Sequence, residues 1–197
     1  MKKNILPLIA ISLILFSFTT IVEDTYKVDV NKSKISWKGF KPTGSHYGSI
    51  MLKNGHFIIK DDQIIGGEFT IDMNSIVDLD MPADNEYNAK LVNHLKSEDF
   101  FGVEKHPTAS FKITTAQPKG DKTLIKGDLT IKNITNPVAF LATVNNNGDV
   151  LNVKSETFKI DRSKWDVKYK SKSFFDDLAD KFIYDDMEIS FDLKASK

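Results

Sequence analysis

The stretch NHLKSEDFFGVEKHPTASFKI, residues 93–113, decides the fold because a helical pattern is followed directly by a strand pattern within it. Leu91 and Leu95 are four positions apart, as residues on the apolar face of a helix are, and two adjacent phenylalanines follow them. Gly102 interrupts this pattern. Pro107 favours extended geometry at the residue before it, and the residues after it alternate between apolar and polar, as in a half-buried strand. We therefore predict that a helix ends and a sheet resumes here.

Most of the remaining chain shows the two-residue alternation of β-strands. The alternating segments are residues 26–30, 35–37, 50–52, 57–59, 65–73, 109–113, 125–131, 138–144 and 187–193. Turn-forming residues separate many of them, at Asn54-Gly55, Asp61-Asp62, 119–121 and 146–149. Short strands at this spacing are typical of a barrel or a sandwich, so the predicted fold class is all-β.

Two segments depart from the simple strand pattern. Between Leu151 and Ile160 the apolar residues change from odd to even positions, which predicts a bulge or a change of sheet face. Residues 173–182, SFFDDLADKF, place apolar side chains on one helical face and acids on the other, with Ser173 in position to cap the N-terminus. We predict a second short helix here, so that two helices would cover a β-structured body as lids.

The N-terminal segment, residues 1–22, has the character of a secretory signal peptide. Two lysines precede a mostly apolar run from Ile5 to Phe18. Extended to Val22, the run reaches the length of a short membrane span, and the cleavage pattern is weak, so the segment is either a removed signal peptide or an uncleaved anchor. Residues 23–197 then form one domain, because no Pro/Gly/Ser-rich linker divides them. The predicted location is periplasmic or secreted.

Composition excludes several classes of function. The chain has no cysteine, which rules out disulfides, thiolate metal sites and a cysteine nucleophile. Without residues 1–22, which carry two lysines and no acid, 25 basic and 27 acidic residues remain, a net charge of −2. Such a balance does not favour a polyanionic partner, so we expect no nucleic acid.

Sequence motifs for catalysis are missing as well. The chain contains no Gly-x-Ser-x-Gly elbow, phosphate-binding glycine loop or dinucleotide fingerprint. Its four histidines, at positions 46, 56, 94 and 106, show neither the i, i+4 spacing nor the His-x-His pairing of zinc or iron ligands. Convergence of distant residues in space is not visible in a sequence. On the motifs alone we expect neither an enzyme nor a cofactor nor a metal site.

Several segments, taken together and in order, are specific enough to suggest a family. They are SHYGSI (45–50), GGEFTIDMNSI (66–76), HLKSEDFF (94–101), HPTASFKI (106–113), GDLTIKNIT (127–135) and IDRSKW (160–165). The chain resembles the YceI-like family of lipid-binding proteins, from about Tyr26 to Leu193. The resemblance implies an antiparallel lipocalin-like β-barrel of about eight strands, with one or two short helices, that encloses a long isoprenoid or another apolar chain.

Aromatic residues are the main candidates for contact with such a ligand. The chain has 14 phenylalanines, five tyrosines and two tryptophans. Trp37, Phe69, Phe111 and Phe140 fall on the predicted inward face of their strands. A barrel of this size either fills itself with side chains or leaves room for one small ligand, so these rings either pack a solid core or line a cavity. The family resemblance favours the cavity.

A polar head group would need contacts at the mouth of the barrel. Arg162, Lys164, Trp165 and Tyr169 are candidates, although an arginine at a strand end also commonly forms a surface ion pair. His46 stands in a predicted glycine-flanked turn, where its side chain either faces the mouth or bonds to nearby backbone. The candidate ligand-binding residues are Trp37, His46, Phe69, Phe100, Phe111, Leu129, Phe140, Arg162, Trp165 and Tyr169.

Two hypotheses for the function remain open on the sequence. The first is an exported carrier of an isoprenoid, quinone or similar lipid, with transient membrane contact. The second is a filled barrel that acts as an interaction or stress-related module and binds no ligand. Dimerisation through an exposed strand edge is compatible with both.

Overall fold

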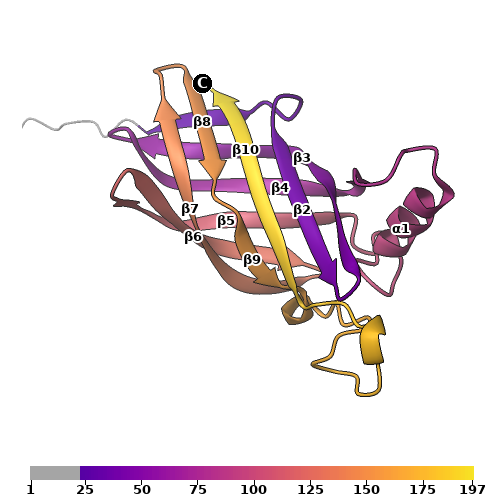
Figure 1. Cartoon of the computed structure of the whole chain (residues 1–197). Coiled ribbons are helices and arrows are strands. Elements are labelled where there is room, and N and C mark those ends of the chain that lie inside the picture. Colours follow the sequence, from indigo (N-terminus) through magenta and orange to yellow (C-terminus); the bar gives the residue numbers. More distant parts are fainter. Residues whose placement is uncertain (1–22) are drawn as a thin grey trace, which may run out of the picture.

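A computed structural model describes residues 23–197, so the predicted signal peptide lies outside the described residues. Ten strands form one antiparallel sheet that closes on itself, with one α-helix at one end (Figure 1). The strands are β1 (Asp24–Val28), β2 (Lys34–Lys41), β3 (Gly44–Lys60), β4 (Gln63–Asp78), β5 (Thr108–Lys119), β6 (Lys122–Ile131), β7 (Ile134–Asn146), β8 (Val150–Ser155), β9 (Phe158–Asp161) and β10 (Asp186–Ser196). The helices are α1 (Glu86–Lys96) and the short 3-10 turns η1 (Arg162–Trp165) and η2 (Ala179–Lys181).

The ring is closed by β10, which pairs with strands from both ends of the sheet. It bonds to β2 through residues such as Ile189, opposite Trp37, and to β8 through residues such as Leu193, opposite Val153. The strands β8 and β9 follow one another along the same side of β10, and β1 and β2 together fill the gap between β3 and β10. The circuit is therefore eight strands wide, which confirms the predicted barrel.

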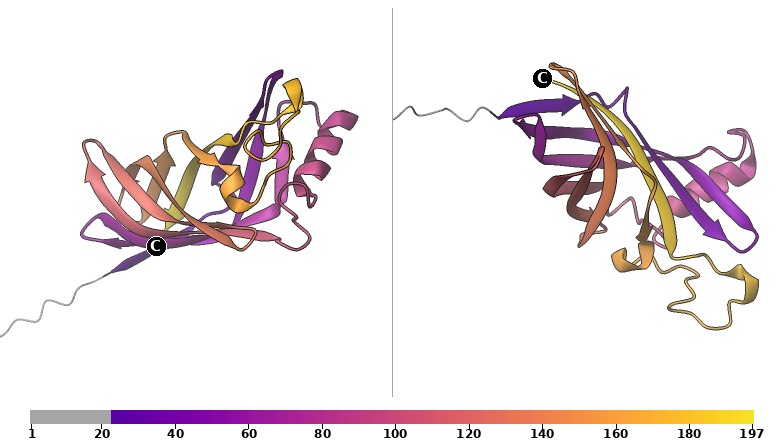
Figure 2. Two further views of the ribbon diagram at one scale, coloured as in Figure 1. Left: turned by 90° about the horizontal axis from the view of Figure 1, so that it is seen from below. Right: turned by 60° about the vertical axis from the view of Figure 1, so that its left-hand side comes forward.

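All the longer connections gather at one end of the barrel, which we call the covered end (Figures 1 and 2). Helix α1, the β2–β3 and β6–β7 turns and the segment 162–185 lie there. The opposite end, which we call the turn end, carries the tight hairpins of β3–β4, β5–β6 and β7–β8. The two ends of the barrel therefore carry different kinds of connection.

The predicted turns at Asp61-Asp62, 119–121 and 146–149 are confirmed. Asp61 and Asp62 have φ values of 49° and 60°, which suit a tight hairpin, and Gly120 and Gly148 also have positive φ. The turn predicted at Asn54-Gly55 is wrong. Both residues pair with β4 inside the continuous strand β3, next to an irregularity between Leu52 and Asn54.

The helix predicted before Gly102 is present as α1. Asn85 caps it, because its side chain accepts a hydrogen bond from the Tyr87 N–H at 2.9 Å. After the helix, Gly102 adopts a left-handed φ of 54°, and β5 begins at Thr108, directly after Pro107. The predicted sequence of helix, break and strand is confirmed.

The second helix, predicted over residues 173–182, is wrong. Only Ala179–Lys181 forms a single 3-10 turn, and the left-handed φ values of Asp177 and Ala179, 47° and 45°, interrupt any longer helix. Ser173 does not cap a helix; its hydroxyl donates to Asp185 Oδ2 at 2.7 Å. One α-helix, not two, covers the barrel among the described residues.

The interior has two groups of packed apolar side chains. One lies towards the turn end and includes Tyr26, Phe57 and Leu151, each at most 2% exposed. The other lies at the covered end, where Trp37 and Met73 meet Leu95 of α1. Within residues 23–197, no helix is long and apolar enough to cross a bilayer.

Candidate functional site

A cavity of about 200 Å³ runs between the two apolar groups, inside the barrel. Every strand except β1 and β8 contributes to its wall, and Leu95, Phe100 and Phe101 complete the wall at the covered end. Among the described residues, Arg162 and Tyr184 are the only wall side chains with a charge or a hydroxyl group. The interior therefore suits an apolar ligand or an apolar part of one.

The alternation of β-strands brings the predicted rings together in this wall. Trp37, Phe69, Phe111 and Phe140 all line the cavity, together with the candidates Phe100 and Leu129. Their contact with a ligand stays a prediction.

The rings form a continuous series around the interior. Phe111 lies 6.4 Å from Phe69 and 5.6 Å from Phe140, measured between ring centroids. Phe140 in turn stacks on Phe158 at 4.7 Å and meets Phe191 edge-on at 5.1 Å. Such pairs hold one another in place through their quadrupoles and their buried area. The series partly fills the barrel and leaves the remaining space apolar.

Two glycines let rings lie flat against the wall. A Cβ built on Gly48 would stand 1.8 Å from the Val77 carbonyl oxygen and 2.7 Å from the Trp37 ring. A Cβ on Gly127 would stand 2.4 Å from Phe111 Cζ. Only glycine allows a ring to come this close to the backbone. The Trp37 ring therefore packs against β3 and the Phe111 ring against β6, which leaves more of the cavity open.

Replacing Gly48 by alanine is expected to lower the free energy of unfolding by about 1–3 kcal/mol, as overpacking does in a tight interior. The new methyl group would press on both the β3–β4 pairing and the Trp37 ring. Equilibrium unfolding in urea measures the loss. Gly39→Ala is the matched control, because nothing lies within 4 Å of its added Cβ. Equal stability of the two variants would contradict the argument.

Arg162 is buried at the covered end and does not form a surface ion pair. Its guanidinium donates to the carbonyl oxygens of Val167 at 2.8 Å, Tyr169 at 3.0 Å, Ile183 at 3.1 Å and Tyr184 at 3.2 Å. Burial lowers the pKa of Arg162, and the nearby carboxylates oppose this effect. These bonds hold the segment 166–185 across the end of the barrel.

The contacts of the Arg162 side chain limit its predicted role, which was to bind the head group of a ligand. Asp185 lies 3.3 Å from its Nη2, and the guanidinium carbon lies 5.8 Å from the centre of the Phe100 ring. Its side chain borders the cavity, but each of the three guanidinium nitrogens already has a partner in the protein. Contact with a ligand head group stays a prediction, with the clamping of the segment as its evident role.

Trp165 and Tyr169, also predicted from the head-group argument, lie outside the cavity wall. Trp165 is 2% exposed, and its Nε1 donates to the Leu129 carbonyl at 2.9 Å, so it fixes η1 to the end of β6. Tyr169 packs its ring against His94 at 4.6 Å and Phe100 at 5.4 Å. Lys164 uses its backbone carbonyl to accept a bond from Asn136. Trp165 and Tyr169 thus contact the wall residues Leu129 and Phe100 without lining the cavity themselves.

His46 lies elsewhere than the sequence predicted. It belongs to strand β3, and the turn falls before Gly44. It does not line the cavity; it borders a shallow open depression beside α1, with Lys41, Tyr87 and His94 among its neighbours. The side chain is therefore on the rim of the covered end.

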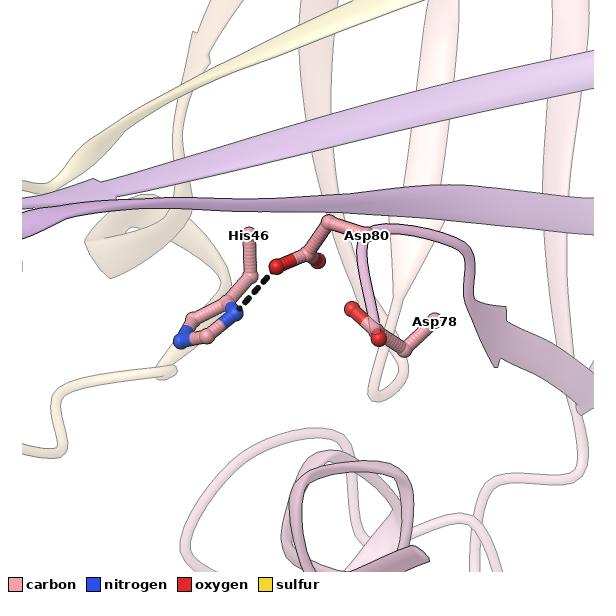
Figure 3. A group of neighbouring side chains, drawn as sticks. All are labelled: His46, Asp78 and Asp80. Atoms are coloured by element: carbon pink, nitrogen blue, oxygen red, sulfur yellow. Dashed lines mark hydrogen bonds and ion pairs between the residues drawn. The ribbon is translucent and has the colours of Figure 1, made fainter. Parts of the chain in front are cut away.

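A cluster of polar residues that the sequence did not predict surrounds His46 (Figure 3). Its Nδ1 lies 3.0 Å from Asp80 Oδ2, and the carboxylate of Asp78 faces the same point. Burial, followed by the effect of the neighbouring Asp80 carboxylate, raises the pKa of Asp78 to about 6. Burial alone would raise the pKa of Asp80 too, but the neighbouring Asp78 and the bonds from the Tyr47 N–H and His46 outweigh it and lower that pKa. Asp78 therefore keeps its proton to a higher pH than Asp80 does.

The only signal that could have indicated this cluster is the spacing Asp78-Leu79-Asp80 at the end of a strand pattern, which places two acids on one side. His46 is more than 30 positions away, and β3–β4 pairing brings it near. The wall residues Phe158, Ile183 and Tyr184 were also missed, since they stand at a strand break or in the segment before β10.

Residues 26–195 match the YceI-like domain. A UPF0312 protein of Photorhabdus laumondii is 30% identical over 160 residues, and the protein YceI of Escherichia coli O157:H7 is 31% identical over 156 residues. The aligned regions cover 75% of both chains in the first case and 76% of both in the second.

Solved structures share the fold. The crystal structure of Burkholderia cenocepacia BcnA superposes with a TM-score of 0.65 at 24% identity, covering 86% of this chain and 99% of BcnA. A polyisoprenoid binding domain from Saccharophagus degradans superposes with a TM-score of 0.62 at 12% identity, covering 87% of this chain and 97% of that domain. At these identities the likeness concerns the fold.

Proposed function

The chain belongs to the YceI-like family, and from this premise we propose that it is an exported binding protein that holds an isoprenoid, quinone or similar apolar-chain lipid inside its barrel. The observation that carries the proposal is the apolar cavity enclosed by β2–β7, β9, β10 and α1. The polyisoprenoid binding domain with the same fold supports the choice of ligand class.

The energetics of such a site favour a hydrocarbon chain. Each buried CH₂ contributes roughly 0.8 kcal/mol. Most of the wall offers no hydrogen-bond partner. A charged or hydrogen-bonding ligand would therefore lose its hydrogen bonds to water without gaining others from the protein. Tyr184 and Arg162 line the cavity from the part of the chain that lies at the covered end, so the proposal puts a head group at this end and the tail among the rings of Phe69, Phe111 and Phe140.

The size of the cavity sets the scale of the ligand. At about 200 Å³ it is smaller than the roughly 300–1,000 Å³ of typical ligand pockets. It accommodates part of a chain as it stands, and a longer chain requires rotation of rings such as Phe140 and Phe158 or displacement of α1. The presence of open space supports the carrier over the alternative of a filled barrel that acts as an interaction module.

We also propose that the chain binds its ligand without catalysing a reaction on it. Over the described residues, the cavity wall carries no carboxylate, imidazole or serine or threonine hydroxyl that could act as a nucleophile or general base. Export to the periplasm or outside the cell rests on residues 1–22 of the sequence. A homodimer stays a prediction.

Transient contact with a membrane has support in the segment 166–185. Phe174 and Phe175 are each 49% exposed, and the Lys168 ammonium lies 4.8 Å from the centre of the Phe174 ring. Exposed rings beside lysines suit the interface of a bilayer, where apolar and charged groups meet. This segment stands at the covered end, where cargo would enter.

The test of the proposal is mass spectrometry of an organic extract from the protein, made in a bacterium from the full chain and purified without detergent. We expect an apolar-chain lipid in about one-to-one ratio with the protein. A clean extract, together with failure to take up added polyprenols, would contradict the proposal and favour the interaction module.

A further inference from the structure

We propose that His46, Asp78 and Asp80 form a binding site for a divalent transition-metal ion of the Zn²⁺ type at the rim of the covered end. One ligand atom from each side chain lies within 4.8 Å of the other two. The site is separate from the apolar cavity, since none of the three residues lines that cavity. The inference does not depend on the lipid proposed above.

The strongest indication is the state of Asp78, which is 5% exposed. Its Oδ2 accepts bonds from the Met81 N–H at 3.1 Å and from Asn88 Nδ2 at 3.3 Å. Its Oδ1 is buried and has no hydrogen-bond donor. Because a buried carboxylate oxygen without a partner is costly, this atom needs a proton or a cation facing it.

Asp80 repeats the arrangement at the second position. Its Oδ1 accepts a bond from the Tyr47 N–H at 3.0 Å, and its Oδ2 faces His46 Nδ1. Each carboxylate thus has one oxygen held by the protein and one directed to the common centre (Figure 3). Asn88, itself 9% exposed, orients Asp78 from helix α1. Such outer contacts are what fixes the ligands of a metal site in position.

The donor set determines the class of ion. One imidazole nitrogen with two carboxylate oxygens suits Zn²⁺, which commonly takes three protein ligands and leaves the fourth position to water. Ca²⁺ and Mg²⁺ prefer oxygen ligands throughout. The shallow depression that His46 borders provides space for the fourth ligand.

Binding requires small movements of the three side chains. Ligands at about 2.1 Å from a tetrahedral ion lie roughly 3.4 Å apart, so the longest separation must shorten and the His46–Asp80 contact must lengthen slightly. His46 and Asp80 are partly exposed and free to adjust. The Lys41 ammonium donates to the other ring nitrogen, Nε2, at 3.2 Å, so without an ion the ring proton is on Nδ1 and points to Asp80. Binding therefore also requires the exposed Lys41 side chain to move away, so that the proton transfers to Nε2 and Nδ1 is free for the ion.

The test is calorimetric titration with ZnCl₂ of protein made from the full chain, without a histidine tag and treated first with a chelator. We expect one Zn²⁺ per chain, a melting temperature that rises with Zn²⁺ concentration, and no comparable response to Mg²⁺. Asp78→Asn should weaken Zn²⁺ binding at least tenfold. It should also stay folded, because an amide keeps the acceptor for Met81 and Asn88 and offers an N–H to Asp80.

Matched variants make the result specific. His46→Asn should also lose at least tenfold in affinity, while His56→Asn, at another histidine of strand β3, should bind as the unchanged protein does. Absence of stoichiometric Zn²⁺ binding would overturn the proposal and leave a proton shared by the two aspartates as the occupant. Unchanged affinity in both Asp78→Asn and His46→Asn, or loss in His94→Gln alone, would place the ion elsewhere and also overturn it.

Discussion

Replacing Arg162 by methionine is expected to lower the free energy of unfolding by about 3–5 kcal/mol, the effect of breaking a buried ion pair from one side. Methionine keeps apolar bulk beside the cavity but removes every bond to the four carbonyl oxygens of the segment 166–185. It also leaves the carboxylate of Asp185, which is 16% exposed, without its cation. Urea unfolding followed by tryptophan fluorescence measures the loss.

Two companion variants separate this effect from general damage. Lys159→Met removes the cation of an exposed pair with Asp186, 3.9 Å apart on the neighbouring strands, and should cost less than about 1 kcal/mol. Adding Asp185→Asn to Arg162→Met should recover part of the lost stability, since no unpaired charge remains. An Arg162→Met protein within about 1 kcal/mol of the unchanged one would show that the clamp is not essential to the covered end.

Replacing Leu129 by tryptophan is expected to reduce the co-purified lipid at least tenfold. Leu129 lines the cavity from β6, and an indole ring in its place would occupy much of the roughly 200 Å³ available. The added bulk should cost about 1–3 kcal/mol of stability, which the barrel can tolerate. Extraction and mass spectrometry measure bound lipid per mole of folded protein.

Thr130→Trp is the matched control for this variant. Thr130 is the next residue of the same strand, and its hydroxyl bonds to Thr135 at 2.8 Å on the outer face. A tryptophan there adds the same ring without entering the cavity, so the lipid content should be unchanged. If Leu129→Trp held as much lipid as Thr130→Trp, the ligand would have to bind outside the cavity.

Strand alternation predicted the site residues that lie in the middle of regular strands. Trp37, Phe69, Phe111 and Phe140 all face inwards because the two-residue period is preserved along their pairings. Where pairing is irregular, the same reasoning fails. Ile65, assigned to the apolar side of its strand, is 43% exposed, while Ile64 is 3% exposed, next to the register shift at Ile58 and Ile59.

Local signals were also overruled by contacts between distant residues. Asn54-Gly55 has the sequence of a hairpin turn, but the long pairing of β3 with β4 continues through it, and the Phe69 ring lies against Gly55. In the segment 173–182, the helical pattern yields to bonds from Ser171 and Ser173 to Asp185, which Arg162 also contacts. These partners are 12 to 23 positions apart, beyond the range of a local pattern.

The polar cluster was beyond prediction for a related reason. His46 stands on β3, while Asp78 ends β4 and Asp80 follows it, so the three meet only when the hairpin of these two long strands has formed. The orienting Asn88 comes from a third element, α1. A single sequence shows that these residues are present, but it does not show that they lie close together in the folded chain.

The position of β10 has a consequence for how the barrel forms. This strand is the last of the ten in the chain, yet it pairs with β1, β2, β8 and β9 and closes the ring. Before β10 is made, only the eight strands β1–β8 can pair with one another, because β9 pairs with β10 alone, and the sheet they form is open at both edges. Closure then joins residues more than 150 positions apart, such as Ile35 and Phe191, which is typical of slow, nonlocal folding. If the earlier strands pair before β10 is made, the interior is open along one side at that stage, and we expect a hydrocarbon chain to have easier access to it then than in the closed barrel.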